Sequence, residues 1–239
     1  VRATGGAAEA THLTRFASAR DRYELGNAND MVVALTWSDP SGISVEKRYR
    51  FEKGSYAIGL EQVVTNGSGE VWRGAEYARI KRYSREQERS MFDVDSYSFD
   101  GPVIYDGERS RKLDRDDLID APYEFRTDSG WVATIQHHFL NAIVPPKGER
   151  QIYRVLVDGS VARASLINAE AQRIASGAEA TFSTTAFIGP KLHAQMDRID
   201  ETLKLTVDYG WLTIISEPLF WLLSFVYEYV ANWGLAIII

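Results

Sequence analysis

Polar and apolar residues alternate along much of the chain between residues 31 and 189. From Ile43 to Phe51 every second residue is apolar, with Lys47 as the exception, and the intervening positions are Ser, Glu and Arg. A period of two residues indicates a half-buried antiparallel strand. The other expected strands cover residues 56–64, 71–80, 131–140, 151–157, 161–167 and 181–188.

Turn signals separate several of these strands. Lys53-Gly54 connects the first two, Asn66–Gly69 follows, and Asp158-Gly159 is the strongest short hairpin signal in the chain. Residues 84–120 are charged and weakly patterned, so we expect mostly loop there. No convincing helix separates the strands, which disfavours a parallel sheet and favours a sandwich or a related double-sheet fold.

The pattern changes from alternating to helical at Gly189-Pro190. Leu192, Met196, Ile199 and Leu203 recur at spacings of four, three and four, which predicts an amphipathic helix over 190–205.

The chain becomes very apolar from Trp211 onward. Ser216 is a plausible N-cap with Pro218 in the first turn, and Ser224, Glu228 and Asn232 form one narrow polar stripe. This helix also carries rings that favour a membrane interface: Trp211, Trp221, Tyr227, Tyr229 and Trp233. We therefore expect an interfacial helix lying on a membrane, with a buried core helix as the alternative.

Composition narrows the classes of function. The chain has 239 residues, a net charge of −6 and no cysteine, which excludes a disulfide framework or a thiol nucleophile and disfavours nucleic acid as a partner. The first ten residues contain no apolar signal segment. The chain begins without Met and ends inside an apolar run, so we expect it to be part of a longer protein.

Residues with catalytic or metal-binding chemistry form no convincing constellation. His137 and His138 are adjacent on an expected strand, so they should point to opposite faces. Asp93–Tyr97 begins like a calcium loop, but Tyr97 takes a ligand position, and the acidic run over 114–120 is better explained as a solvated loop. Phosphate-binding loops and nucleophile elbows are also absent from the sequence. We predict no catalytic residue, metal site or cofactor.

Several motifs resemble the YidC membrane protein insertase family of Gram-negative bacteria. They are Leu205–Leu212, Ile215–Leu223 and Asn232–Ile239, with looser matches at Lys53–Tyr56, Gly130–Ala133 and Phe187–Lys191. The resemblance runs from about Met31 to Ile239, and the first thirty residues match poorly. It implies a mainly β fold, a galactose-mutarotase-like β-supersandwich followed by C-terminal α-helices. The expected domains are the supersandwich over 1–189, an amphipathic linker helix over 190–210, and an interfacial helix with the start of a transmembrane segment over 211–239.

The resemblance also implies a function. Members insert and fold inner-membrane proteins, alone or with the Sec translocon, and their large domain faces the periplasm and contacts SecDF. The implied partners are therefore the Sec translocon, SecDF, nascent inner-membrane proteins and, through the last helix, lipid. The family's intramembrane groove lies beyond this chain, so we expect a binding or scaffold module with no insertase activity of its own. The sandwich could offer a cleft or sheet edge to polypeptide, or act mainly as a spacer.

Six residues are the candidate interface positions. Asp208, Tyr209, Gly210 and Trp211 should break one helix and set the angle of the next, and Pro218 and Trp221 should belong to the interfacial helix. The alternative hypothesis is a carbohydrate-binding protein or a mutarotase-like enzyme. That chemistry needs a histidine and a carboxylate in one cleft, for which His137 or His138 with Glu124 would be candidates.

Overall fold

The computed structural model describes residues 1–83, 99–207 and 213–238. The chain divides into two compact units, Val1–Thr206 and Val207–Ile239, and each is considered by itself.

The first unit is mainly β. Its strands are β1 (Arg2–Ala3), β2 (Ala17–Ser18), β3 (Asp30–Ser38), β4 (Ile43–Glu52), β5 (Ala57–Asn66), β6 (Trp72–Ala75), β7 (Tyr77–Tyr83), β8 (Gly101–Tyr105), β9 (Ser110–Lys112), β10 (Tyr123–Thr127), β11 (Trp131–Gln136), β12 (Phe139–Val144), β13 (Gln151–Asp158), β14 (Val161–Asn168), β15 (Gln172–Ile174) and β16 (Glu179–Pro190). The helical segments of this unit are α1 (Arg115–Asp120), α2 (His193–Met196) and the 3-10 helix η2 (Glu201–Thr206).

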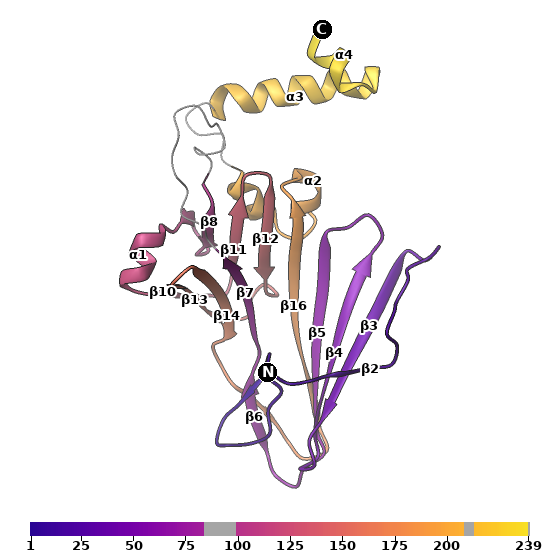
Figure 1. Ribbon diagram of the computed structural model, residues 1–239, viewed down its shortest axis with the longest axis vertical. Coiled ribbons are helices and arrows are strands. Elements are labelled where there is room, and N and C mark those ends of the chain that lie inside the picture. The colour runs from indigo at the N-terminus through magenta and orange to yellow at the C-terminus, as the bar shows by residue number, and fades with distance from the viewer. Residues whose placement is uncertain (84–98, 208–212, 239) are drawn as a thin grey trace. The chain divides into compact units, whose positions relative to one another are not determined.

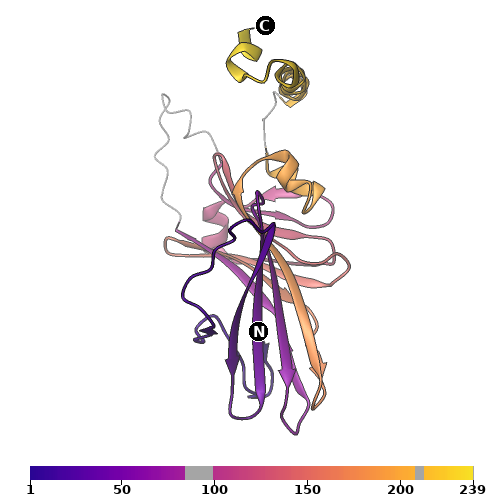
Figure 2. The same cartoon turned by 90° about the vertical axis from the view of Figure 1, so that its right-hand side faces the viewer.

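The strands form three antiparallel sheets. The largest has nine strands in the order β2-β3-β4-β5-β16-β12-β11-β8-β9, and a four-stranded sheet, β10-β13-β14-β7, packs beside part of it (Figure 1). A small sheet, β1-β6-β15, completes the unit. Figure 2 shows the long strands β3, β4, β5 and β16 running side by side. This architecture confirms the expected mainly β supersandwich with C-terminal helices.

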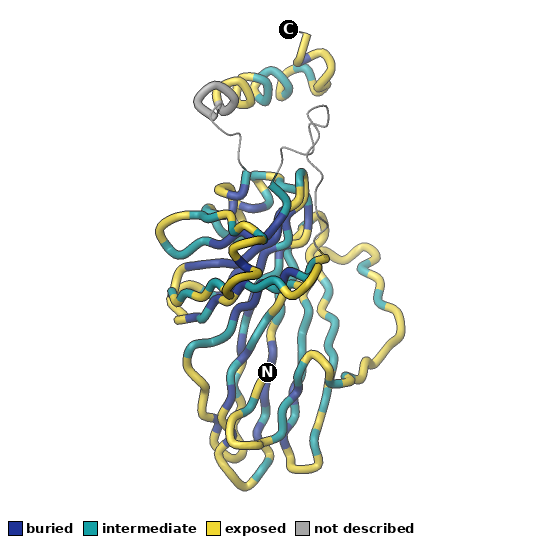
Figure 3. The backbone as a smooth tube through the Cα atoms, turned by 60° about the vertical axis from the view of Figure 1, so that its left-hand side comes forward, coloured by how far each residue is buried: buried dark blue, intermediate teal, exposed yellow. Residues whose placement is uncertain are grey.

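Two apolar clusters hold the sheets together. One gathers Val45, Val64, Trp72 and Phe182 where the small sheet meets the ends of the long strands. The other lies between the two larger sheets and includes Ile104, Val132, Ile143, Tyr153 and Leu166. Figure 3 shows that buried positions concentrate in these regions, whereas much of β3, β4 and β5 is only partly buried.

The predicted hairpins at Lys53-Gly54 and Asp158-Gly159 are confirmed. Strand β4 pairs with β5 and β13 pairs with β14, both antiparallel. Gly54 and Gly159 have φ values of 72° and 58°, a left-handed backbone that favours glycine.

Other strand predictions were wrong in their boundaries. The expected strand over 71–80 is interrupted at the buried Glu76, which divides it into β6 and β7 in different sheets. The expected strand over 131–140 is a hairpin, β11 and β12, that turns at His137-His138. The described part of the expected loop over 84–120 contains β8, β9 and α1, and pairing with β11 stabilises β8 there.

The helix expected over 190–205 is not continuous. The strand β16 extends through Pro190, and two short segments follow, α2 and η2. Met196 and Leu203 are fully buried, so their helical spacing reflects packing within the first unit.

The second unit consists of α3 (Thr213–Val230) and α4 (Trp233–Ile238). The helix α3 begins at Thr213, so Ser216 is not its N-cap, and Pro218 lies inside the helix, where it forfeits one main-chain hydrogen bond. Asn232 instead precedes α4, and its side-chain oxygen accepts a hydrogen bond from the Leu235 N–H at 3.2 Å. Among the described residues, no helix is both long and apolar enough to cross a membrane.

Candidate functional site

The nine-stranded sheet presents an apolar face that is only partly covered. Along β4, Ile43 and Val45 are buried, whereas Tyr49 and Phe51 on the same face are intermediate in exposure. Paired residues of neighbouring strands share a face, so the partners of these side chains extend the surface across the sheet. We call it the concave face; it comprises Met31, Val33, Leu35, Tyr49, Phe51, Ile58, Leu60, Ala186 and Ile188.

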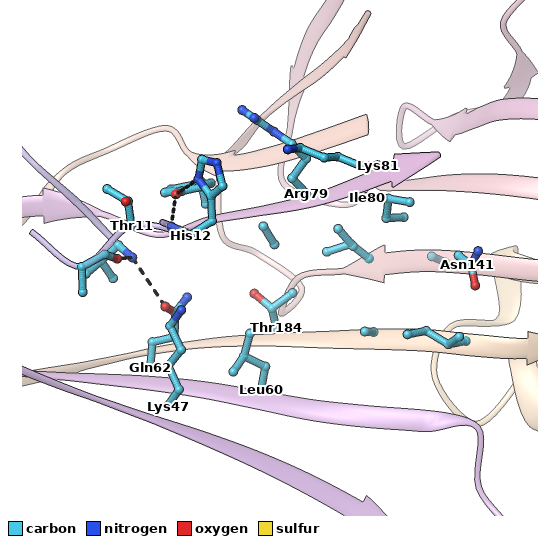
Figure 4. Close-up of a pocket in the computed structure, with 18 residues that line it drawn as sticks. Thr11, His12, Lys47, Leu60, Gln62, Arg79, Ile80, Lys81, Asn141 and Thr184 are labelled. Carbon is cyan, nitrogen blue, oxygen red and sulfur yellow. Dashed lines mark hydrogen bonds between the residues drawn. The ribbon is translucent and has the colours of Figure 1, made fainter. Parts of the chain in front are cut away.

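A cavity of about 670 Å³ opens between the concave face and β7 (Figure 4). Its lining is mostly apolar and includes Leu60, Ile80, Ile143 and Ala186, with Thr184 beside Leu60 (Figure 4). Thr11, His12, Lys47 and Gln62 lie toward one end, which we call the polar end, and Asn141 lies toward the other (Figure 4). Among the described residues that line it there is no Asp or Glu.

Lys47 is the basic residue that interrupts the alternation of β4. Its Nζ lies 4.3 Å from the centroid of the Phe16 ring, a cation–π contact. Burial lowers the pKa of Lys47, and the negative charge of Glu76 opposes this shift. Lys47 is therefore a partly desolvated cation at the polar end of the cavity.

Glu76 is 2% exposed and is hydrogen-bonded to Gln62, one of the residues that line this end of the cavity. The Gln62 Nε2 donates a hydrogen bond to Glu76 Oε1 at 2.7 Å. Burial raises the pKa of Glu76 above its usual value, because desolvation disfavours the carboxylate more than the Gln62 hydrogen bond favours it.

Two of the motifs noted in the sequence meet in space. The Ile188 N–H donates to the Tyr56 carbonyl oxygen at 3.0 Å, and the Tyr56 and Phe187 rings lie 6.3 Å apart. The Tyr56 ring covers Gly189 so closely that a Cβ there would lie 2.5 Å from Tyr56 Cγ. The turn after β4 and the end of β16 thus form one packed junction.

A polar network fixes η2 against β11. Trp131 is fully buried, and its Nε1 donates to Thr202 Oγ1 at 2.8 Å. The Thr202 N–H donates to Asp200 Oδ1 at 2.8 Å, and Lys147 Nζ lies 3.7 Å from Asp200 Oδ2. The segment after β16 is therefore tied to the sandwich by hydrogen bonds as well as by apolar burial.

Two of the six candidate interface residues belong to the described part of the chain. Asp208, Tyr209, Gly210 and Trp211 lie outside the described residues. Pro218 and Trp221 belong to α3, where Pro218 is exposed and Trp221 is 68% exposed. The roles predicted for these six residues stay predictions.

The apolar side chains of α3 are largely exposed within the second unit, including Leu219, Phe220, Leu222, Phe225 and Tyr229. Aromatic rings follow one another along the helix. The ring centroids of Trp221 and Phe225 are 5.8 Å apart, and those of Phe225 and Tyr229 are 5.1 Å apart. Such a surface suits a membrane interface.

The histidines occupy positions that the sequence did not predict. His137 and His138 form the β11–β12 turn rather than alternating on a strand, and their ring centroids are 3.8 Å apart. Glu124 belongs to β10 in the four-stranded sheet, whereas the turn belongs to the nine-stranded sheet. The calcium-like stretch at Asp93 lies outside the described residues. In the described part of the chain, no three His, Cys, Asp or Glu side chains gather as a metal site would require.

The sequence did not predict that the residues around this cavity come together as a site. Its walls come from β4, β5, β7, β12, β16 and the segment around Thr11, which are far apart in the sequence. The one local signal was Lys47, a charged residue at an apolar position of an otherwise regular strand.

The first unit is a mainly β supersandwich domain, and the chain then continues into a helix with exposed apolar side chains. The model of the YidC periplasmic domain matches residues 1–222, and the chain belongs to this family. The match begins at residue 1, so the expectation that the first thirty residues fall outside the resemblance was wrong.

Curated relatives agree with this assignment. The membrane protein insertase YidC of Thioalkalivibrio sulfidiphilus is 37% identical over 96% of this chain and 41% of its own length. The protein of the same name from Nitrosococcus oceani is 37% identical over 100% of this chain and 44% of its own length. The chain thus spans less than half the length of these relatives. These homologues are named membrane protein insertases and not enzymes. The family model that matches this chain describes their periplasmic domain.

Solved structures also match this chain, at low sequence identity. The α-galactosidase AgaA of Geobacillus stearothermophilus matches with a TM-score of 0.49 and 10% identity, over 74% of this chain and 27% of its own. A putative aldose 1-epimerase from Klebsiella pneumoniae matches with a TM-score of 0.46 and 11% identity, over 76% of this chain and 56% of its own.

Proposed function

We propose that this chain is the periplasmic part of a bacterial inner-membrane protein insertase and acts as a binding and scaffold module without covalent chemistry. The concave face carries this proposal. Its side chains at Val33, Tyr49 and Leu60 lie in one row across β3, β4 and β5 and remain partly exposed. An apolar sheet face of this kind can shield apolar segments of a nascent membrane protein from water.

The helix α3 supports a location at the membrane surface. Its exposed Leu, Phe and Trp side chains are suited to burial at the headgroup boundary, and Glu228 is exposed as well. We propose that the second unit lies on the periplasmic surface of the inner membrane and that lipid is one partner of this chain. Cooperation with the Sec translocon and SecDF rests on the family resemblance.

The sugar-enzyme alternative finds less support. The described lining of the cavity combines one histidine, His12, with no carboxylate, and the candidate pair of Glu124 with His137 or His138 belongs to two different sheets. General acid–base chemistry on a sugar needs both groups at one substrate.

Site-specific photo-crosslinking in inner membranes tests the proposal. A photoreactive phenylalanine analogue replaces Tyr49 on the concave face of the full-length protein, and in a matched variant it replaces its neighbour Arg50, which points to the other side of β4. We expect adducts to a nascent membrane protein from position 49 and few from position 50. Equal yields from both positions, or none from either in folded protein, would refute binding at the concave face and leave the domain as a spacer.

A probe at Trp221 tests the second unit in the same membranes. We expect adducts to lipid, because this side chain is 68% exposed on an apolar helix. Failure to label lipid would contradict the proposed interfacial position.

A further inference from the structure

The cavity beside β7 has the size and lining of a ligand site. Its volume of about 670 Å³ lies within the range of roughly 300–1,000 Å³ that is usual for small-molecule pockets. Most of its wall is apolar and includes Leu60, Ile80 and Ala186, and Thr184 lies beside Leu60 (Figure 4). We expect an occupant of this wall to be largely apolar, because a buried polar group without a partner is costly.

The polar end of the cavity contains a cation with no ionic partner in the described chain. Lys47 Nζ contacts the Phe16 ring and forms no ion pair among the described residues. The carboxylate that most affects it, Glu76, accepts its hydrogen bond from Gln62 instead. A ligand that brings an anionic group to Lys47 would therefore gain a charge-assisted interaction in a partly desolvated place.

These two features select between kinds of ligand. An extended polypeptide would bring many main-chain N–H and C=O groups against this mostly apolar wall, where Thr184 and Asn141 could pair with only a few of them. A sugar would bring hydroxyl groups to the same wall. An unbranched acyl chain has no polar group to satisfy there and ends in one carboxylate.

We propose that this cavity binds a fatty acid, with its carboxylate at Lys47 and its acyl chain along Leu60, Ile80 and Ala186. This inference does not rest on the insertase proposal, which concerns polypeptide on the wider concave face. It assigns Lys47 a role as the headgroup ligand and explains why a charged residue interrupts the apolar face of β4.

The test compares two ligands of equal chain length on the 239-residue chain. Laurate and 1-dodecanol, both below their aggregation limits, displace a fluorescent fatty acid from the wild-type chain and from Lys47→Gln. We expect the wild type to bind laurate at least about tenfold more tightly than dodecanol, and Lys47→Gln to bind the two alike. Lys53→Gln is the matched control, because Lys53 is exposed in the β4–β5 turn and loses the same charge.

A second variant tests where the acyl chain lies. Ala186→Trp adds bulk to the mostly apolar wall of the cavity and should weaken both laurate and dodecanol, while thermal unfolding shows that the variant remains folded. Unchanged laurate preference in Lys47→Gln, equal affinities of the two ligands for the wild type, or unchanged binding to folded Ala186→Trp would each overturn the proposal. Displacement of the probe by an extended apolar peptide with the same dependence on Lys47 would overturn it in favour of polypeptide.

Discussion

Replacing Leu203 by Ala tests whether the segment after β16 belongs to the folded sandwich unit. Leu203 lies in η2 with no exposed surface, whereas Leu205 in the same element is 48% exposed. Truncating a buried leucine removes apolar carbon from the core and leaves a cavity that the surroundings fill only in part.

The expected loss follows from these two terms. The removed carbons account for about 0.8 kcal/mol per methylene, and the cavity raises the total to about 2–5 kcal/mol of unfolding free energy. A loss of about 3 kcal/mol would lower the Tm by about 6–12 °C in a unit of this size. Urea and thermal unfolding of the 239-residue chain, followed by near-ultraviolet circular dichroism, measure both quantities.

Leu205→Ala is the matched control, because it makes the same chemical change at an exposed position of the same element. It should alter the unfolding free energy by no more than about 0.5 kcal/mol. A linker helix independent of the sandwich would make both substitutions equally mild. Equal effects of the two variants would therefore refute the packing of η2 described above.

Four further predictions concern other parts of the chain. Trp131→Phe removes the hydrogen bond to Thr202 and should cost about 1–3 kcal/mol, and a double-mutant cycle with Thr202→Val that shows no coupling energy would contradict this link. Gly189→Ala places a Cβ 2.5 Å from the neighbouring tyrosine ring, so we expect a clear fall in Tm, and an unchanged Tm would show that the junction yields easily. The raised pKa of Glu76 means that the folded chain keeps its proton to higher pH than the unfolded chain, so stability should fall as pH rises from the usual value of 4.5 through the folded pKa. Glu76→Gln should lack this fall in urea unfolding measured across that range. Trp221→Ser should weaken partition into phosphatidylglycerol vesicles by about tenfold, and unchanged partition in a flotation assay would contradict membrane contact.

The strands could be predicted where local signals and long-range pairing agree. The alternation from Ile43 to Phe51 and the Asp158-Gly159 turn correspond directly to β4 and to the β13–β14 hairpin. The β11–β12 hairpin was missed because His137-His138 lacks the Gly, Asn, Asp or Pro that usually marks a turn. Pairing of β11 with β8 and of β12 with β16 determines that geometry, and neither pairing is local in the sequence.

The prediction of one continuous helix over 190–205 was wrong for a related reason. Spacings of four, three and four place Leu192, Met196, Ile199 and Leu203 on one side of an ideal helix. The structure instead buries Met196 and Leu203 in two short segments and leaves Leu192 48% exposed. Hydrogen bonds from Trp131 to Thr202 and within the turn at Asp200 compensate for the shorter runs of helical bonds. Periodicity indicates candidate core positions, and tertiary contacts decide which of them are buried and in which backbone conformation.

The candidate site also depends on contacts that are not local in the sequence. The sequence showed Lys47 as an irregularity of one strand. Its proposed role in binding depends on its surroundings, which include Phe16, Gln62 and Glu76 from other segments. Because the cavity and the second unit draw on different residues, their proposed roles can fail separately. Loss of laurate preference in Lys47→Gln concerns the cavity alone, and weaker vesicle partition in Trp221→Ser concerns α3 alone. A variant that impaired both measurements would indicate that the two units influence each other, which neither proposal requires.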